Sequence, residues 1–112
     1  MDKNNLNIQD IKKRIKKGKV IWTEHCLNRL NQRDILMTDV INTINTGNII
    51  EYYDSDYPYQ SCLILGKDNN SEILHIVCGI NKDNVYMITA YYPDSIKWED
   101  DMKTRRKNNE LF

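Results

Sequence analysis

The stretch that decides the fold is TDVINTINTGNIIEYY, residues 38–53, because the spacing of its apolar residues changes within it. Its first half places apolar residues at helical spacing after Thr38-Asp39, which predicts a helix that starts there. Gly47 follows as the expected left-handed residue just past the helix end. Residues 49–53 then have the composition of a strand. The chain therefore changes from helices to strands at this point.

Residues before this stretch predict two further helices. Isoleucines at helical spacing among lysines mark a first amphipathic helix that ends near Gly18. A short, apolar, β-prone run follows at residues 20–22. Thr23 is placed to cap the next helix, which buries Leu27 and Leu30.

Residues after Gly47 predict a sheet. Short polar turns and a loop at 54–58 separate four apolar runs, which favours an antiparallel meander. The expected fold is α+β, with N-terminal helices packed on one face of a four-stranded antiparallel curved sheet. We expect a single domain over 1–112, with its core at about 18–99 and a basic C-terminal tail at about 100–112. The predicted strands are residues 49–53, 61–66, 72–80 and 85–92, and residues 94–107 are predicted to be a charged tail or a short final helix.

Alternation along the strands assigns side chains to the two faces of the sheet. The even-numbered residues from Leu74 to Ile80 are all apolar and are predicted to face the helices, so His75 takes the opposite face. Glu51 lies on the same face as His75 if its two neighbours in the strand, Ile50 and Tyr52, point inward. A shift of the strand register by one residue would reverse every one of these assignments. The last strand is predicted to direct Ile88, Ala90 and Tyr92 to the core and Met87, Thr89 and Tyr91 to the opposite face.

The charge of the chain is balanced overall but divided along its length. Residues 1–33 hold nine basic and three acidic residues, a net of +6, and residues 34–112 carry the compensating −6. A second basic cluster lies at 103–107. Such a distribution can focus a positive field on one surface, which suits a polyanion such as RNA. A merely solvated amphipathic helix explains the lysines of residues 12–19 equally well.

Cysteine usage and hydropathy predict a cytoplasmic protein without a membrane segment. Cys26, Cys62 and Cys78 form an odd, widely spaced set that argues against a disulfide framework. The N-terminus lacks the apolar core of a signal peptide, and no apolar run is long enough to span a bilayer. Without closely spaced Cys or His pairs, phosphate loops or dinucleotide motifs, we expect no metal site and no cofactor.

One helix face carries the strongest functional signal. His25, Arg29 and Arg33 are four residues apart, so their side chains rise along nearly the same face of the second helix. An imidazole that titrates near neutral pH then shares a stripe with two permanent cations. RNA backbone cleavage needs such a proton acceptor beside phosphate ligands. A solvated helix face is the alternative interpretation.

Metal-free RNA cleavage needs a base for the 2′-hydroxyl, an acid for the leaving oxygen and donors for the phosphorane charge. The alternative for His75 is a structural role on its strand. The alternative for Arg33 is an ion pair with Asp34 or Asp39. A non-catalytic binder that docks through its basic helix or its tyrosine-rich surface is the alternative for the whole protein. The candidate catalytic residues are His25, His75, Glu51 and Tyr91, and the candidate phosphate ligands are Arg29, Arg33, Arg105 and Arg106.

An ordered set of motifs over about residues 18–99 resembles a small bacterial family, domain of unknown function 4258. That family is similar to the RelE/ParE-like toxins, which implies helices on a curved antiparallel sheet. The resemblance implies a type II toxin that acts as an endoribonuclease on RNA, free or on the ribosome, with a cognate antitoxin as partner. Some relatives inhibit DNA gyrase by binding, which implies a non-catalytic toxin or adaptor as the alternative. The motifs are W-T-x-H-x-x-x-R-x-x-x-R-x-I from Trp22, GNIIEY from Gly47, CLILG from Cys62, LHIV from Leu74 and ITAYYPD from Ile88, and they include His25, Arg29, Arg33, Glu51, His75 and Tyr91.

Overall fold

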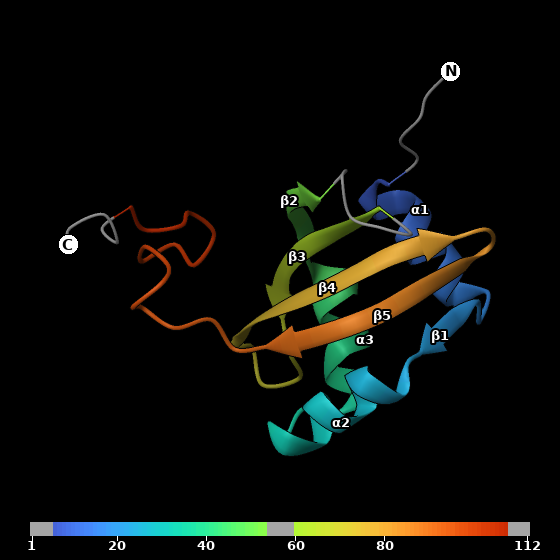
Figure 1. Cartoon of the computed structure of the whole chain (residues 1–112), viewed down its shortest axis with the longest axis horizontal. Helices are drawn as coiled ribbons and strands as arrows, with labels where there is room; N and C mark the ends of the chain where they lie inside the picture. Colours follow the sequence, from blue (N-terminus) through green and yellow to red (C-terminus); the bar gives the residue numbers. More distant parts are fainter. Residues whose placement is uncertain (1–5, 54–59, 108–112) are drawn as a thin grey trace.

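A computed structural model describes residues 6–53 and 60–107, in which three helices precede most of a five-stranded sheet (Figure 1). The predicted loop at 54–58 lies outside the described residues. None of the helices in the described ranges is both long and apolar enough to cross a membrane. In chain order the elements are α1 (Ile8–Lys16), β1 (Val20–Trp22), α2 (Glu24–Gln32), α3 (Met37–Thr46), β2 (Asn48–Tyr53), β3 (Ser61–Lys67), β4 (Ile73–Asn81) and β5 (Asn84–Tyr91).

The sheet confirms the α+β class but corrects the number of strands. Its order is β1-β5-β4-β3-β2, and β2 to β5 form the predicted antiparallel meander. The fifth strand is the short run at residues 20–22, which pairs in parallel with β5 at the edge of the sheet. The expectation of four antiparallel strands was wrong because a three-residue run carries no alternation that would distinguish it from a connector, and its partner lies far along the chain.

The helices cover one face of this sheet, and the core lies between the two layers. In Figure 1, α3 and α1 lie behind the strands, and α2 lies beside the β1–β5 edge. We call the face toward the viewer the open face. The helices contribute Ile11, Cys26, Leu30, Val40 and Ile44 to the core, and the strands contribute Cys62, Ile64, Leu74, Ile76, Cys78, Val85, Met87 and Ala90.

Side-chain caps fix where α2 and α3 begin. The Thr23 hydroxyl accepts the Cys26 N–H at 3.0 Å, which confirms the predicted cap of α2. The third helix starts earlier than predicted, with Leu36 at its N-cap position. There the Asp39 carboxylate accepts the Leu36 N–H at 3.0 Å and takes over the role of a capping side chain.

Gly47 has a different role from the one predicted. Its backbone is extended, with φ −112°, so it is not a left-handed cap. A side chain there would overlap the Leu65 carbonyl oxygen and lie 2.7 Å from that of Thr43. Glycine is required because α3 and β3 approach each other closely, which is a non-local demand.

A bulge in β5 explains which face each of its side chains takes. Val77 pairs with Thr89 and Cys78 pairs with Met87, so Ile88 is the extra residue between them. Met87 therefore points to the core, where it is 1% exposed, and its predicted assignment to the open face was wrong. The bulge leaves the pairing of His75 with Tyr91 in place, so both lie on the open face as predicted.

A second bulge brings Glu51 to the same face. Ile49 pairs with Ile64, but Glu51 pairs with Leu63, so Ile50 is the extra residue in β2. Ile49, rather than Ile50, packs against the core. Glu51 consequently lies on the open face near His75.

Residues 94–107, here named the C-terminal segment, form neither a helix nor a free tail. They fold back in turns, and an isolated bridge joins Trp98 to Arg105. Trp98 is only 2% exposed. The segment is thus a packed part of the molecule that lies beside the end of β5 (Figure 1).

Candidate functional site

The center of the site is a buried histidine on the open face. The Nε2 atom of His75 lies 2.7 Å from the Met102 carbonyl oxygen, and Nδ1 lies 3.3 Å from the Tyr91 hydroxyl. Because a carbonyl only accepts, Nε2 carries the proton and Nδ1 accepts from Tyr91. Burial lowers the pKa of His75, so the imidazole is neutral at pH 7. The Tyr91 hydroxyl is therefore backed by a proton acceptor.

An ion pair lies beside this histidine. Arg105 donates to both carboxylate oxygens of Glu51, at 2.8 and 3.0 Å, and the Tyr53 hydroxyl donates to the same carboxylate at 2.5 Å. Partial burial raises the pKa of Glu51, but the bonds from Arg105 and Tyr53 outweigh burial and lower it below its usual value. Burial and the Glu51 bond raise the pKa of Tyr53 to about 12. Glu51 is thus an anion bound by Arg105 and Tyr53.

Aromatic packing joins the histidine to the ion pair. The Trp98 ring meets the His75 ring edge-on at 4.6 Å between centroids. On Trp98, the Arg105 guanidinium carbon lies 4.5 Å from the ring centroid, a cation–π contact. The C-terminal segment therefore closes over His75 and holds Arg105 in place.

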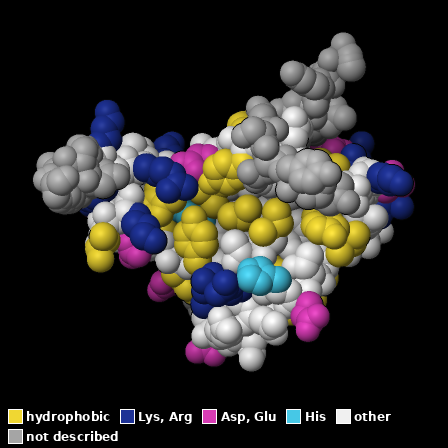
Figure 2. Space-filling model, viewed as in Figure 1, with side chains coloured by type: hydrophobic (Ala, Val, Ile, Leu, Met, Phe, Trp, Pro, Cys, Tyr) yellow, Lys and Arg dark blue, Asp and Glu magenta, His cyan; other side chains and the backbone are white. Residues whose placement is uncertain are grey.

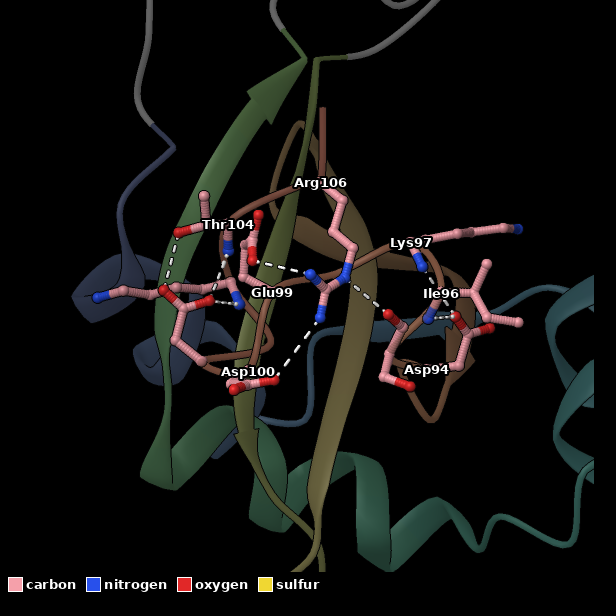
Figure 3. Close-up of polar contacts among 10 residues, drawn as sticks. Asp94, Ile96, Lys97, Glu99, Asp100, Thr104 and Arg106 are labelled. Atoms are coloured by element: carbon pink, nitrogen blue, oxygen red, sulfur yellow. Dashed lines mark hydrogen bonds and ion pairs between the residues drawn. The ribbon is translucent and has the colours of Figure 1, made fainter. Parts of the chain in front are cut away.

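Arg106 braces the C-terminal segment from within (Figure 3). Its guanidinium donates to the Ser95 carbonyl oxygen at 2.7 Å and to Glu99 at 3.0 Å, and lies 3.6 Å from Asp100. Asp94 fixes the preceding turn by accepting the backbone N–H groups of residues 96 and 97. The predicted phosphate ligand Arg106 is thus committed to acids of its own segment.

A groove of about 540 Å³ opens between the end of α2, the end of β5 and the C-terminal segment. Figure 2 shows a band of hydrophobic side chains across this face, with Lys and Arg side chains at one end. Three cations and three aromatic rings in one groove are suited to a phosphate-bearing ligand with stacking groups. The lining includes Arg33, Lys97 and the Glu51-paired Arg105 as cations, Asp94 as an acid, and Tyr91, Tyr92 and Trp98 as aromatic rings.

Arg33 reaches the groove from the C-cap position of α2. Its Nη1 donates to the Ala90 carbonyl oxygen at 2.8 Å and to the Thr89 hydroxyl at 3.3 Å. Among the described residues, Arg33 does not form the alternative ion pair with Asp34 or Asp39. Arg33 therefore lines the groove as a cation that has no ion pair with any acid of residues 6–53 and 60–107.

The other two members of the predicted stripe lie further along α2. Arg29 Nε is 3.4 Å from Nε2 of His25, and His25 is exposed. No hydrogen bond or ring contact between described residues joins His25 to His75. The structure thus groups His75 with Glu51, Tyr91 and Arg105, whereas His25 and Arg29 form a separate pair on α2.

Sequence reasoning missed Lys97 and the Met102 carbonyl. Pro93-Asp94 directly after the last strand predicts a turn, and a turn there returns the following residues toward the strand end. That signal identifies Lys97. Nothing in the sequence points to the Met102 carbonyl, because a backbone acceptor has no residue-type signature.

Metal-ligating residues are scattered in the described ranges. Among residues 6–53 and 60–107, no three His, Cys, Asp or Glu side chains are grouped closely enough to hold a metal ion. The three cysteines are buried free thiols.

Comparison with known proteins gives one match. Searches of curated proteins and of solved structures found nothing similar. The family described as Domain of unknown function (DUF4258) matches residues 22–92, which is more than half of the chain. The matched region runs from the last residue of β1 to the residue after β5 and includes Arg33, His75 and Tyr91. This chain belongs to the DUF4258 family.

Proposed function

We propose that this protein is a metal-independent endoribonuclease that cleaves RNA in the groove, and that it serves as the toxin of a type II toxin–antitoxin pair. The observation that supports this most is Tyr91, which lines a groove with three cations and one acid and whose hydroxyl is hydrogen-bonded to a neutral imidazole. The toxin role rests on the resemblance to RelE/ParE-like proteins and brings with it a cognate antitoxin as partner.

The proposed reaction is an intramolecular transesterification. The 2′-oxygen of a ribose attacks the adjacent phosphorus while the bond from phosphorus to the 5′-oxygen breaks. The 2′-hydroxyl proton passes to the Tyr91 oxygen as the phenolic proton moves to Nδ1 of His75, and the leaving 5′-oxygen takes a proton from water in the open groove. His75 acts through Tyr91 and is a positioning residue.

The charges around the groove fit this reaction. Arg33 and Lys97 supply positive charge where the phosphorane carries negative charge. Burial raises the pKa of Tyr91, so the phenol stays protonated at neutral pH and relays a proton instead of existing as a phenolate. The charge of Glu51 favours the imidazolium that forms transiently, and the charge of Arg105 disfavours it. Arg29 extends the cationic surface along α2.

The test is incubation of the purified protein with end-labelled single-stranded RNA, alone and on translating ribosomes, in excess EDTA. We expect fragments that end in a 2′,3′-cyclic phosphate. Arg33→Ala should lower the rate by about 100-fold because it removes a phosphate ligand. Lys103→Ala, an exposed cation that does not line the groove, is the matched control. Absence of cleavage in both substrates, or fragments formed only when metal is added, would contradict the proposal.

The second candidate is a non-catalytic toxin or adaptor that binds a protein target. It is favoured by the internal partners of His75 and Glu51, because a purely structural network would have the same hydrogen bonds. Growth arrest on expression separates the two. If the Tyr91→Phe substitution abolishes growth arrest, the result supports cleavage. If the variant still arrests growth fully, the result supports binding.

A further inference from the structure

A second groove, of about 670 Å³, lies between α1 and α3, in the helical layer on the side of the sheet away from the candidate site. Its apolar surface comes from Ile15 of α1 and Ile41 of α3, which pack against the core and remain partly exposed. The side chains of Lys12, Lys13 and Lys16 line it. The groove thus has an aliphatic floor and a cationic rim.

These three lysines have no acidic partner among residues 6–53 and 60–107. Arg14 of the same helix behaves differently, because it pairs with Asp10 at 2.9 Å and also donates to the Lys82 carbonyl. Within α1, the cations without an acidic partner among the described residues are therefore the three lysines that line the groove. Its field is therefore complementary to an anionic ligand that also carries aliphatic side chains.

The residue types distinguish between two classes of anionic partner. Single-stranded nucleic acid is held by arginine forks and by aromatic rings that stack on bases, as in the groove at Tyr91. The α1–α3 groove is lined by neither arginine nor an aromatic ring. Isoleucines flanked by lysines instead fit a helix with aliphatic residues on one face and carboxylates at its borders.

We propose that the α1–α3 groove binds an acidic amphipathic helix of a partner protein. The helix lies between α1 and α3, buries aliphatic side chains against Ile15 and Ile41, and pairs its carboxylates with Lys12, Lys13 and Lys16. This surface is independent of the RNA-cleavage proposal, because it lies on the other side of the sheet.

The test uses a fluorescein-labelled peptide of about five helical turns, with Leu every third or fourth residue and Glu beside the leucines. Its anisotropy is titrated with the full chain. We expect saturable binding that weakens as salt rises, and the double variant Lys12→Glu/Lys16→Glu should bind about tenfold more weakly or worse. The matched control is Lys17→Glu/Lys19→Glu, which makes the same charge change at exposed positions outside the groove and should retain affinity.

Three results would overturn the proposal. One is a lack of saturable binding by a correctly folded wild-type chain. Another is equal affinity for a peptide of the same composition with its apolar face scrambled. The third is displacement of the peptide by single-stranded RNA or by anionic lipid vesicles at comparable charge, which would make the groove a general polyanion surface.

Discussion

His75 shows how one residue links the sheet to the groove. Its ring is fully buried, and both nitrogens are engaged, one by the Met102 carbonyl and the other by Tyr91. A buried imidazole with these partners fixes the tautomer, because only Nε2–H can bond a carbonyl. Its task in the proposed mechanism is to hold the Tyr91 proton without contacting RNA.

The burial of His75 predicts a pH dependence of stability. Because burial lowers its pKa below the ordinary value of 6.5, the unfolded chain binds this proton more tightly than the folded chain does. The stability contributed by the neutral, buried imidazole is fully present above pH 6.5 and is lost as the pH falls below that value. The free energy of unfolding then decreases with a limiting slope of about 1.4 kcal/mol per pH unit. Thermal unfolding between pH 7 and pH 5 should show the decline in the wild type.

Two histidine variants make this prediction specific. His75→Gln should flatten the dependence on pH in that range, whatever its effect on the absolute melting temperature. His25→Gln should leave the decline intact, because His25 is exposed. A decline that disappears in His25→Gln and persists in His75→Gln would contradict the assignment.

At the level of single residues, sequence patterns identified much of the site but not its roles. Alternation placed His75 and Tyr91 on one face correctly, because both obey the period of an extended strand. Helical spacing grouped His25 with Arg33, yet only Arg33 reaches the groove, because it sits at the C-cap where the helix meets β5. Which groups are buried depends on the C-terminal segment, and its fold is set by contacts that no local pattern encodes.

At the level of elements, two glycines permit α3 to lie directly against the sheet. A side chain at Gly66 would overlap the Thr43 carbonyl oxygen of α3, which is backbone and cannot move aside by rotation. Gly66→Ala should therefore destabilise the protein by about 3 kcal/mol, the upper part of the range for overpacking. The measurement is chemical denaturation.

Gly18→Ala is the control for Gly66→Ala. Gly18 has φ +76° and open space around it, so alanine there meets only backbone strain, costing about 1 kcal/mol. Equal losses at the two positions would contradict the close approach of α3 and β3.

The C-terminal segment is the element that local patterns predicted least well. Its charged residues predict a solvated tail. In the structure, Arg105 pairs with Glu51 and Trp98 packs against His75, so the segment is attached to the sheet. Arg105→Ala should speed amide hydrogen exchange in residues 94–107 by about tenfold or more, with a small effect on global stability because the ion pair is half exposed. Lys103→Ala should leave exchange unchanged, and unchanged exchange in Arg105→Ala would show that the pair does not anchor the segment.

Strand bulges and the edge strand explain the other differences from the predicted elements. The bulge at Ile88 changes the face of Met87 without changing that of Tyr91, so simple alternation is right on one side of it and wrong on the other. The run at Val20–Trp22 becomes a strand only because β5 offers a free edge. Both outcomes depend on pairing partners that are remote in sequence.

At the scale of the whole molecule, the sheet separates two surfaces of different chemistry. The open face ends in a groove with arginine, lysine and aromatic rings, and the helical layer carries a groove with lysine and isoleucine. The net charge of zero hides this arrangement, because acidic residues elsewhere balance both sites. Charge distribution, rather than total charge, supports the proposed binding of RNA at one surface and of an acidic helix at the other.

The central claim is that Tyr91 carries out proton transfer during RNA cleavage in the groove. The most direct measurement is the single-turnover cleavage rate of Tyr91→Phe in EDTA, compared with Tyr52→Phe, which removes a hydroxyl from an exposed tyrosine outside the groove. The account predicts a loss of about 100-fold or more for Tyr91→Phe and a wild-type rate for Tyr52→Phe. A folded Tyr91→Phe variant that cleaves RNA at the wild-type rate would contradict it.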